Sequence, residues 1–183
     1  MTATAQRPRA TTETTGHSGE RPQSFTELRR LTAEQIEALY FKADTPTPEA
    51  FTGDYDGYLL GGRVVGVGKA FPIHAVNQPV LPWKGKVFSR SRGARGAGGN
   101  RIAVGALRTT IWPFETWVGP SRLGTGTTLH IDYDLPRNPF WLRYGIFDEL
   151  RQLGPELFLG LGGLRVAGAD RFIFSWAVRP VRK

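Results

Sequence analysis

From Phe51 to Val178 the chain is a succession of short apolar segments separated by glycine and proline, with one helix-like stretch among them. Frequent turns of this kind favour short strands over long helices. Because a parallel α/β sheet needs a helix between consecutive strands, these segments predict an antiparallel sheet. Such a sheet removes its unpaired edges by curling into a closed barrel, and about eight strands leave room for one small ligand. We therefore predict a mainly β protein, a closed antiparallel β-barrel of roughly seven to nine strands.

The clearest strand pattern runs from Thr127 to Leu135, where apolar and polar side chains alternate. Alternate residues of a strand point to opposite faces, so Asp132 and Tyr133 are expected on different sides of the sheet. Segment 64–71 is apolar but interrupted by glycines, and its structure stays ambiguous. Residues 89–100, rich in arginine and glycine, are expected to form a mobile basic loop. The other expected strands are residues 51–60, 83–88, 101–112, 115–118, 157–161 and 171–178.

An N-terminal helix, broken or hairpin-like, is predicted over residues 24–42. Two capping-box patterns open it, one from Ser24 to Glu27 and a second from Thr32 to Gln35. The second is followed by Ile36, Leu39 and Tyr40, whose spacing makes one apolar stripe. The stretch before Pro46 ends this helix, because a residue that precedes proline avoids the helical region.

A second helix is predicted near the C-terminus, over residues 138–153. Asn138 is a favourable N-cap, Pro139 suits the first helical position, and Gly154 follows the last turn. Its expected buried stripe consists of Leu142, Ile146, Leu150 and Leu153.

The length of 183 residues fits one domain. Residues 1–23 contain no large apolar side chain beyond Met1, so they are expected to form a disordered tail before a single barrel domain at 24–183. The chain has no cysteine, which excludes disulfides, thiolate catalysis and cysteine-ligated metals. No apolar run reaches the roughly 18 residues of a membrane span, and no secretory signal is present, so a cytoplasmic location is expected. The oligomeric state stays open.

The net charge of +8 is concentrated in one segment. No acidic residue lies between Asp56 and Glu115, whereas nine basic residues do: Arg63, Lys69, Lys84, Lys86, Arg90, Arg92, Arg95, Arg101 and Arg108. A local positive field attracts phosphates, carboxylates, nucleic acid or an acidic protein. A solvated basic surface explains the same charges equally well.

Several short motifs in residues 80–178 form a recognisable set: Trp83-Lys-Gly-Lys-Val-Phe88, Asp132-Tyr133, Ile146-Phe-Asp-Glu-Leu-Arg151 and Gly154-Pro-Glu-Leu-Phe-Leu-Gly160. The set resembles that of uncharacterised actinobacterial small β-barrel proteins. These are calycin-like, meaning similar to lipocalins and fatty-acid-binding proteins. The resemblance implies a barrel with a cavity and no established reaction. Phe147 stands where the pattern has arginine, and on a helix Arg143 would share its face and replace it.

Polar candidates for a site come from the motifs around residues 132–151. Tyr133 and Asp132 are candidate catalytic groups, because a phenol or a carboxylate in a cavity can move a proton or polarise a carbonyl. Arg143, Asp148 and Arg151 are candidate ligand-binding groups, since carboxylate and guanidinium anchor polar ligand atoms. The alternative is that these residues only tie the second helix to the barrel.

Aromatic candidates come from the five tryptophans, a high number for one small domain. Trp83, Trp112 and Trp176 lie in expected strands and are the candidates to line a pocket for an apolar ligand. Lys86, from the basic segment, is a further ligand-binding candidate. Each aromatic residue taken singly has the alternative of filling the core.

His130, Asp132 and Asp134 alternate along one strand face, a spacing that can hold a metal. A second histidine with any pattern is missing, so a solvent-facing polar stripe is the better interpretation. Neither a metal nor another cofactor is expected.

Three hypotheses for function follow. The first is binding of a small, mostly apolar ligand that carries a carbonyl or carboxyl group. The second is a cofactor-free cyclase, isomerase or dehydratase of polyketide-like secondary metabolism, in which an enclosed cavity enforces reactive geometry. The third is nucleic-acid binding through residues 84–108, for which one arginine–glycine run without aromatics is weak support. That segment also suits an acidic carrier protein as a partner.

Overall fold

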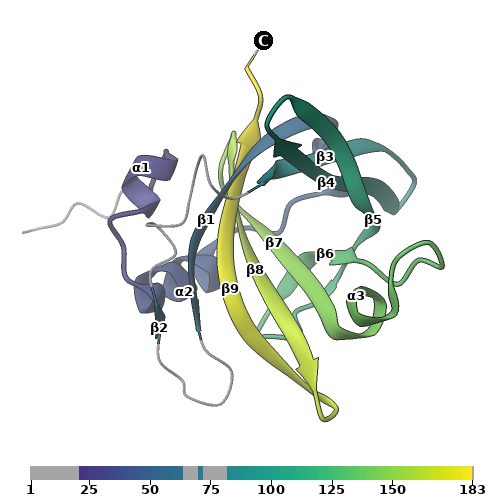
Figure 1. Cartoon of the computed structure of the whole chain (residues 1–183). Helices are drawn as coiled ribbons and strands as arrows, with labels where there is room; N and C mark the ends of the chain where they lie inside the picture. The colour runs from purple at the N-terminus through teal and green to yellow at the C-terminus, as the bar shows by residue number, and fades with distance from the viewer. Residues whose placement is uncertain (1–20, 64–69, 72–81, 183) are drawn as a thin grey trace, which may run out of the picture.

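The computed structural model describes residues 21–63, 70–71 and 82–182. Helices and strands alternate little along the chain (Figure 1). The elements are α1 (Phe25–Leu28), α2 (Ala33–Lys42), the 3-10 turn η1 (Pro48–Ala50), β1 (Gly53–Arg63), β2 (Ala70–Phe71), β3 (Trp83–Arg92), β4 (Arg95–Val104), β5 (Leu107–Pro120), β6 (Thr127–Asp132), α3 (Phe140–Gly145), β7 (Ile146–Gly154), β8 (Leu157–Val166) and β9 (Ala169–Pro180).

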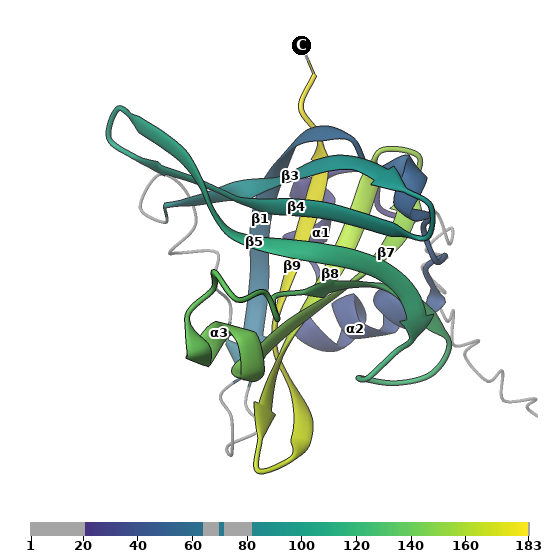
Figure 2. The ribbon, with the colours of Figure 1, turned by 90° about the vertical axis from the view of Figure 1, so that its right-hand side faces the viewer.

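Eight antiparallel strands close into a barrel, as the sequence predicted. From β3 to β9 each strand pairs with the next along the chain, and β1 pairs with both β3 and β9 to complete the ring. The short β2 adds to β1 outside this ring. Figures 1 and 2 show β3, β4 and β5 crossing on one side and β1, β9, β8 and β7 on the other.

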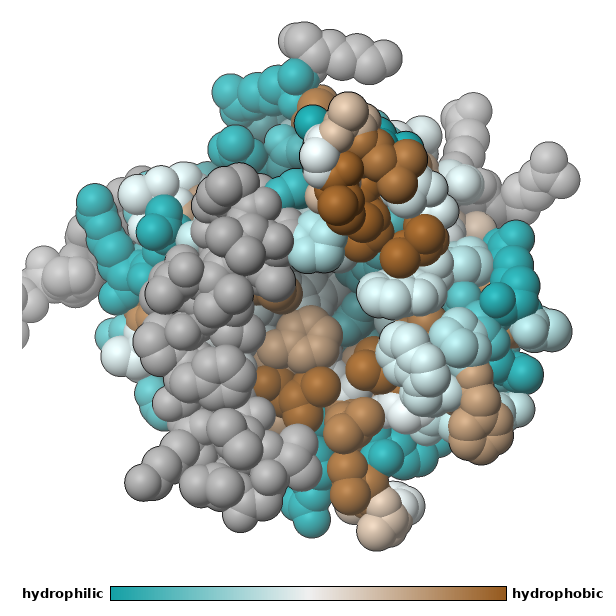
Figure 3. Space-filling model, viewed as in Figure 1, coloured by the Kyte–Doolittle hydropathy of each residue, from teal (hydrophilic) through white to brown (hydrophobic). Residues whose placement is uncertain are grey.

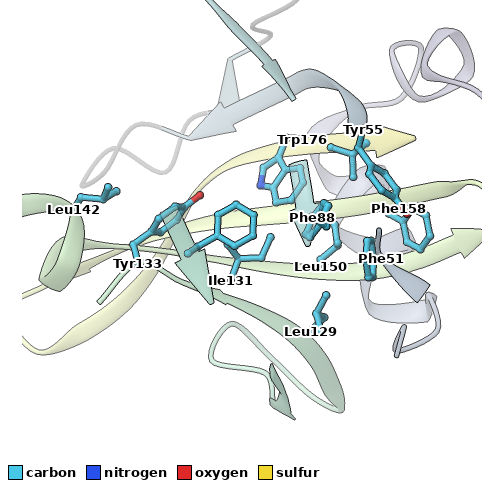
Figure 4. Packing of buried hydrophobic residues seen from close by; sticks show 12 residues of the cluster. Phe51, Tyr55, Phe88, Leu129, Ile131, Tyr133, Leu142, Leu150, Phe158 and Trp176 are labelled. Carbon is cyan, nitrogen blue, oxygen red and sulfur yellow. The ribbon is translucent and has the colours of Figure 1, made fainter. Parts of the chain in front are cut away.

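One end of the barrel is filled by aromatic rings. Phe51, directly after η1, lies 4.7 Å from Phe88 and 4.7 Å from Phe158 between ring centroids. Tyr55 and Phe114 complete this group, and Figure 4 shows its labelled members gathered away from Leu142. Burial of large aromatic side chains is the main favourable contribution to the fold here. It leaves the opposite end, next to α3, for a cavity.

A second apolar cluster lies outside the barrel, where α1 and α2 cover β7, β8 and β9. The capping box from Thr32 to Gln35 forms as predicted, and Ile36 and Tyr40 of α2 are buried. They pack on outward side chains of the strands, among them Leu153 and Leu161. Consequently β7 and β8 are buried on both faces.

The prediction of a helix over 138–153 was wrong beyond residue 145. The helix α3 covers Phe140–Gly145, and Ile146–Gly154 is the strand β7. The apolar residues fit helical spacing because β7 is covered on both faces, which removes the alternation that marks a half-exposed strand. Asn138 is not the N-cap: its Nδ2 donates to the carbonyls of Pro113 and Tyr133, at 2.7 Å each.

The expected basic loop at 89–100 is instead a hairpin of β3 and β4, which turns at Gly93 with a φ of +69°. The expected single strand 101–112 belongs to two strands, since β4 ends at Val104 and β5 begins at Leu107. Pro113 lies within β5, at an irregularity in its pairing with β4. Glycine-rich strands lack the apolar pattern that identifies a strand in a sequence, which explains the first error. The second error is a missed turn at Gly105, whose φ is +57°.

His130 does not belong to a solvent-facing stripe, contrary to expectation. Its side chain stacks on Trp117 at 4.0 Å between ring centroids, and its Nε2 lies 2.9 Å from the carbonyl of Pro120. Burial lowers the pKa of His130, although the neighbouring Glu149 opposes this. Trp117, Pro120 and Glu149 surround this side chain, and sequence alternation alone does not reveal these neighbours.

Several expectations concern the termini and the β1–β3 connection. Residues 1–20, 64–69 and 72–81 lie outside the described residues, and so does most of the ambiguous segment 64–71. Arg21, expected in the tail, donates from Nη1 to Oδ2 of Asp44 at 2.7 Å. Within the described part, no helix is long and apolar enough to cross a membrane.

Candidate functional site

A cavity of about 590 Å³ occupies the barrel end next to α3. This volume lies in the range of pockets that hold small molecules, roughly 300–1,000 Å³. Most of its wall is apolar, with side chains from β1, β3, β4, β5, β7, β8, β9 and α3. The lining residues are Leu59, Trp83, Lys86, Asn100, Trp112, Tyr133, Trp141, Leu142, Ile146, Asp148, Leu164, Ile173, Phe174 and Trp176.

The floor of the cavity is a polar cluster centred on Lys86, which is 2% exposed. The Lys86 Nζ donates to Oδ1 of Asn100 at 3.0 Å, to the hydroxyl of Tyr133 at 2.8 Å and to Oδ2 of Asp148 at 3.0 Å. The Tyr133 hydroxyl in turn donates to Oδ2 of Asp148 at 2.8 Å. Three acceptors around one amine are the surroundings of an ammonium ion, and Asp148 is its counter-charge.

Aromatic rings surround the same ammonium group. Nζ of Lys86 lies 4.7 Å from the ring centroid of Trp176, 5.1 Å from that of Phe114 and 5.4 Å from that of Tyr133. Cation–π attraction strengthens when the cation is removed from water. Lys86 therefore separates the aromatic end of the barrel from the cavity.

Burial sets the protonation behaviour of this cluster. It lowers the pKa of Lys86, because the charged amine is removed from water, and the carboxylate of Asp148 opposes that shift. It raises the pKa of Tyr133 well above 10.0, and the negative charge of Asp148 acts in the same direction. Tyr133 is therefore a neutral phenol across the physiological pH range, and its hydroxyl donates a hydrogen bond to Asp148.

Asn100 joins the polar cluster to Trp83 of β3 and to Trp112 of β5. Its Oδ1 accepts from Nε1 of Trp83 at 3.0 Å as well as from Lys86. Its Nδ2 donates to the carbonyl of Trp112 and to the hydroxyl of Tyr133, each at 3.3 Å. All hydrogen-bonding positions of this amide are in use.

Glycines in neighbouring strands make room for the two tryptophans of the floor. A Cβ on Gly160 of β8 would come within 2.1 Å of Trp176, and one on Gly57 of β1 within 2.4 Å of Trp83. The two indoles meet edge to face, with ring centroids 6.1 Å apart. Each ring thus lies flat on the backbone of a glycine, which fixes its orientation in the wall.

The mouth of the cavity carries Trp112 and Trp141, whose rings meet edge to face at 5.8 Å. Trp112 has a φ of +50°, an uncommon conformation for a residue with a side chain. It lies at the irregularity between β4 and β5, and bulges of this kind redirect side chains near functional sites. Trp141 and its neighbour Phe140 are exposed. Figure 3 shows apolar surface gathered around a hollow in the face seen in Figure 1.

Most of the residues predicted as site candidates gather at this cavity. Trp83, Lys86, Trp112, Tyr133, Asp148 and Trp176 all line it. The sequence analysis missed Asn100, because this residue lay in a segment expected to be a loop. Its position follows from the pairing of β3 with β4, which places Asn100 directly opposite Lys86. No local pattern in the sequence indicates that pairing.

The remaining candidates lie away from the cavity. Asp132 accepts a hydrogen bond from the backbone N–H of Asp134 at 3.0 Å, and Arg143 forms a salt bridge with Asp134 at 2.9 Å. Arg151 is buried outside the barrel, where it donates to the carbonyls of Phe41 and Thr125 at 3.1 and 2.6 Å. Among the described residues no group of three histidine, aspartate or glutamate side chains is placed to hold a metal ion.

The basic segment 84–108 is divided by the fold. Lys86 points into the barrel, and Arg101 forms a salt bridge with Asp56 at 3.3 Å. Arg95 forms another with Glu115 at 3.0 Å. Charges that follow each other in the sequence therefore do not all contribute to one basic surface.

Comparisons with known proteins add one structural similarity. A protein from Thermomonospora curvata, known from its crystal structure, matches with a TM-score of 0.45 and 14% identity, over 83% of this chain and 89% of the other. No protein-family model matches the sequence, and no curated protein matches it.

Proposed function

We propose that the protein binds one small, mostly apolar molecule in the cavity beside α3. The observation that carries this proposal is a closed barrel that is filled at one end and hollow at the other, with a largely apolar wall above a polar floor. Barrels of eight antiparallel strands in sequential order hold ligands in this way in lipocalins, and we propose the same calycin-like use here. A volume of about 590 Å³ suits a ligand of one to several rings.

The orientation of the ligand follows from the distribution of apolar and polar side chains in the cavity wall. Aromatic and aliphatic side chains at the mouth and sides contact its apolar body, and the Lys86 cluster faces its polar end. Of the carbonyl- or carboxyl-bearing ligands expected from the sequence, a carboxylate is disfavoured. The carboxylate of Asp148 is already in the floor, and Lys86 directs its donors to protein acceptors.

Titration with N-phenyl-1-naphthylamine, a neutral probe whose fluorescence rises in apolar surroundings, tests this proposal. We expect saturable binding of one probe per chain. Leu164 is half-buried in the cavity wall, so Leu164→Trp fills the cavity and is expected to weaken binding at least tenfold. Leu107→Trp is the matched control, because Leu107 is 63% exposed on the β4–β5 hairpin and is not part of the cavity wall.

Equal affinities for the two variants, or a signal that does not saturate, would show that the probe binds elsewhere and that the proposal is wrong. Circular dichroism of both variants establishes that they are folded. Native mass spectrometry of the purified protein complements the titration, since a co-purified molecule would identify the ligand class directly.

A further inference from the structure

The hydrogen bonds of the cavity floor can be counted atom by atom. Lys86 directs its three donors to three acceptors, and Asn100 uses both its oxygen and its amide nitrogen. The Tyr133 hydroxyl donates to Asp148 and accepts from Lys86. These three side chains have no capacity left for a ligand.

Two buried polar atoms of the same floor have no hydrogen-bond partner among the described residues: Oδ1 of Asp148 and Nε1 of Trp176. Both residues line the cavity and are at most 3% exposed. One atom is an acceptor with a negative charge, and the other is a donor without charge. Leaving such atoms buried and unpaired is unfavourable, because each loses its hydrogen bonds to water on burial, so a partner in the cavity is favoured.

The two atoms belong to β7 and β9, the two strands that flank β8, and both side chains contact Lys86. Its Nζ lies 3.0 Å from Oδ2 of Asp148 and 4.7 Å from the ring centroid of Trp176. Figure 4 shows the indole nitrogen of Trp176 on the side of its ring that faces the hydroxyl of Tyr133. Asp148 and Trp176, which carry the unpaired acceptor and the unpaired donor, therefore both line the cavity beside Lys86.

We propose that the ligand is an alcohol or phenol whose hydroxyl group enters this end, donating to Oδ1 of Asp148 and accepting from Nε1 of Trp176. This inference rests on the proposed binding function. A ketone, ester or ether accepts from Trp176 but leaves Asp148 unpaired. A carboxylate adds a second negative charge next to Asp148. A hydroxyl group supplies one donor and one acceptor and meets both needs.

An ordered water is the alternative partner for the two atoms. A ligand hydroxyl reproduces the hydrogen bonds of the water that it displaces, whereas an ether or a hydrocarbon does not. The affinities of hydroxyl and non-hydroxyl ligands of the same shape therefore distinguish the two alternatives. Tighter binding of the hydroxyl ligand indicates a hydroxyl site, and equal binding indicates a floor that keeps its water.

The experiment is isothermal titration calorimetry at pH 7 with four probes of one shape: 2-naphthol, 2-methoxynaphthalene, naphthalene and 2-naphthoate. We expect 2-naphthol to bind about tenfold or more tightly than the ether and the hydrocarbon, because a hydrogen bond to a charged acceptor contributes at least that factor. The anion 2-naphthoate is expected to bind most weakly.

Trp176→Phe supplies the variant, because it keeps an aromatic ring over Gly160 and removes the N–H donor. It is expected to weaken 2-naphthol binding by about three- to tenfold and to change naphthalene binding less than twofold. Trp117→Phe is the matched control, since Trp117 stacks on His130 outside the cavity. It is expected to leave all four affinities unchanged.

Equal binding of 2-naphthol and its methyl ether, or tightest binding of 2-naphthoate, would overturn the hydroxyl site while leaving the cavity as a ligand site. The same holds if none of the four probes binds although N-phenyl-1-naphthylamine does. Failure of N-phenyl-1-naphthylamine as well would overturn the binding function itself.

Discussion

Lys86 and Asp148 are the residues on which the interior depends most. An ammonium and a carboxylate at 3.0 Å, both almost fully buried, compensate each other in a medium where an isolated charge is very costly. The pair is held by Tyr133 and Asn100, which occupy the remaining positions on Lys86. Removal of one partner therefore harms the protein more than removal of both.

A double-mutant cycle tests this dependence. Lys86→Met leaves the Asp148 carboxylate buried without a counter-charge, so we expect the free energy of unfolding to fall by about 3–5 kcal/mol. In Lys86→Met/Asp148→Asn the charge is absent and the amide still accepts from Tyr133, so the loss is expected to be smaller than in the single variant. Urea denaturation measures Lys86→Met, Asp148→Asn and the double variant. Losses that simply add would contradict the coupling.

At the scale of elements, α2 is attached to the barrel through polar as well as apolar contacts. The Tyr40 hydroxyl lies 2.8 Å from Oγ1 of Thr128 and donates to Oε2 of Glu149 at 3.1 Å. Glu149, fully buried, also accepts from the hydroxyl of Ser121 and the backbone N–H of Arg122. This carboxylate thereby joins α2, β7 and the connection between β5 and β6.

Tyr40→Phe probes that attachment. The variant leaves Glu149 with one donor fewer while the ring stays in place, so we expect a loss of about 1–2 kcal/mol in the free energy of unfolding. Tyr144→Phe on α3 is the control, because Tyr144 is 46% exposed, and it is expected to change stability by less than about 0.5 kcal/mol. Chemical denaturation of both variants provides the measurement. Equal stabilities would show that the hydroxyl of Tyr40 does not contribute to holding α2.

For the whole molecule, buried tyrosines inside and outside the barrel limit stability at alkaline pH. Burial raises the pKa of both Tyr133 and Tyr40 above the usual 10.0. Above pH 10.0 the unfolded chain loses phenolic protons that the folded chain keeps, so stability falls as pH rises. Lys86 has the opposite effect, because burial lowers its pKa below 10.5. Just below pH 10.5 the unfolded chain binds a proton at this lysine that the folded chain has lost, so stability rises with pH there.

We therefore expect the free energy of unfolding to rise slightly towards pH 10.0 and to fall above it. Tyr133→Phe is expected to reduce the fall, and Lys86→Met is expected to remove the rise. Urea denaturation at a series of pH values, with Tyr144→Phe as control, measures both effects. A fall that is unchanged in Tyr133→Phe would assign the alkaline loss to other groups.

Local patterns in the sequence account for much of this architecture. The turn-rich apolar segments predicted a closed antiparallel barrel, and two capping boxes placed the N-terminal helices. These signals are local, because backbone propensity and side-chain periodicity act over a few residues. They also identified Trp83, Lys86, Tyr133, Asp148 and Trp176 as candidates, since aromatic and ionisable residues in strands of a small barrel are suited to a cavity.

Tertiary structure decided what depends on neighbours distant in the chain. Ile146–Gly154 is a strand because the barrel covers one of its faces and α2 covers the other, although its spacing of apolar residues also fits a helix. Asn100 reaches Lys86 through strand pairing, which the glycines around it do not reveal. Arg143 and Arg151 lie away from the cavity. Arg143 is on α3 and pairs with Asp134, and Arg151 is on the outer face of β7 and donates to the carbonyl of Phe41. The sequence by itself indicated the barrel and six of the fourteen side chains that line its cavity. The closure of the barrel alone decided which of them face one another, because register and burial arise between strands far apart in sequence.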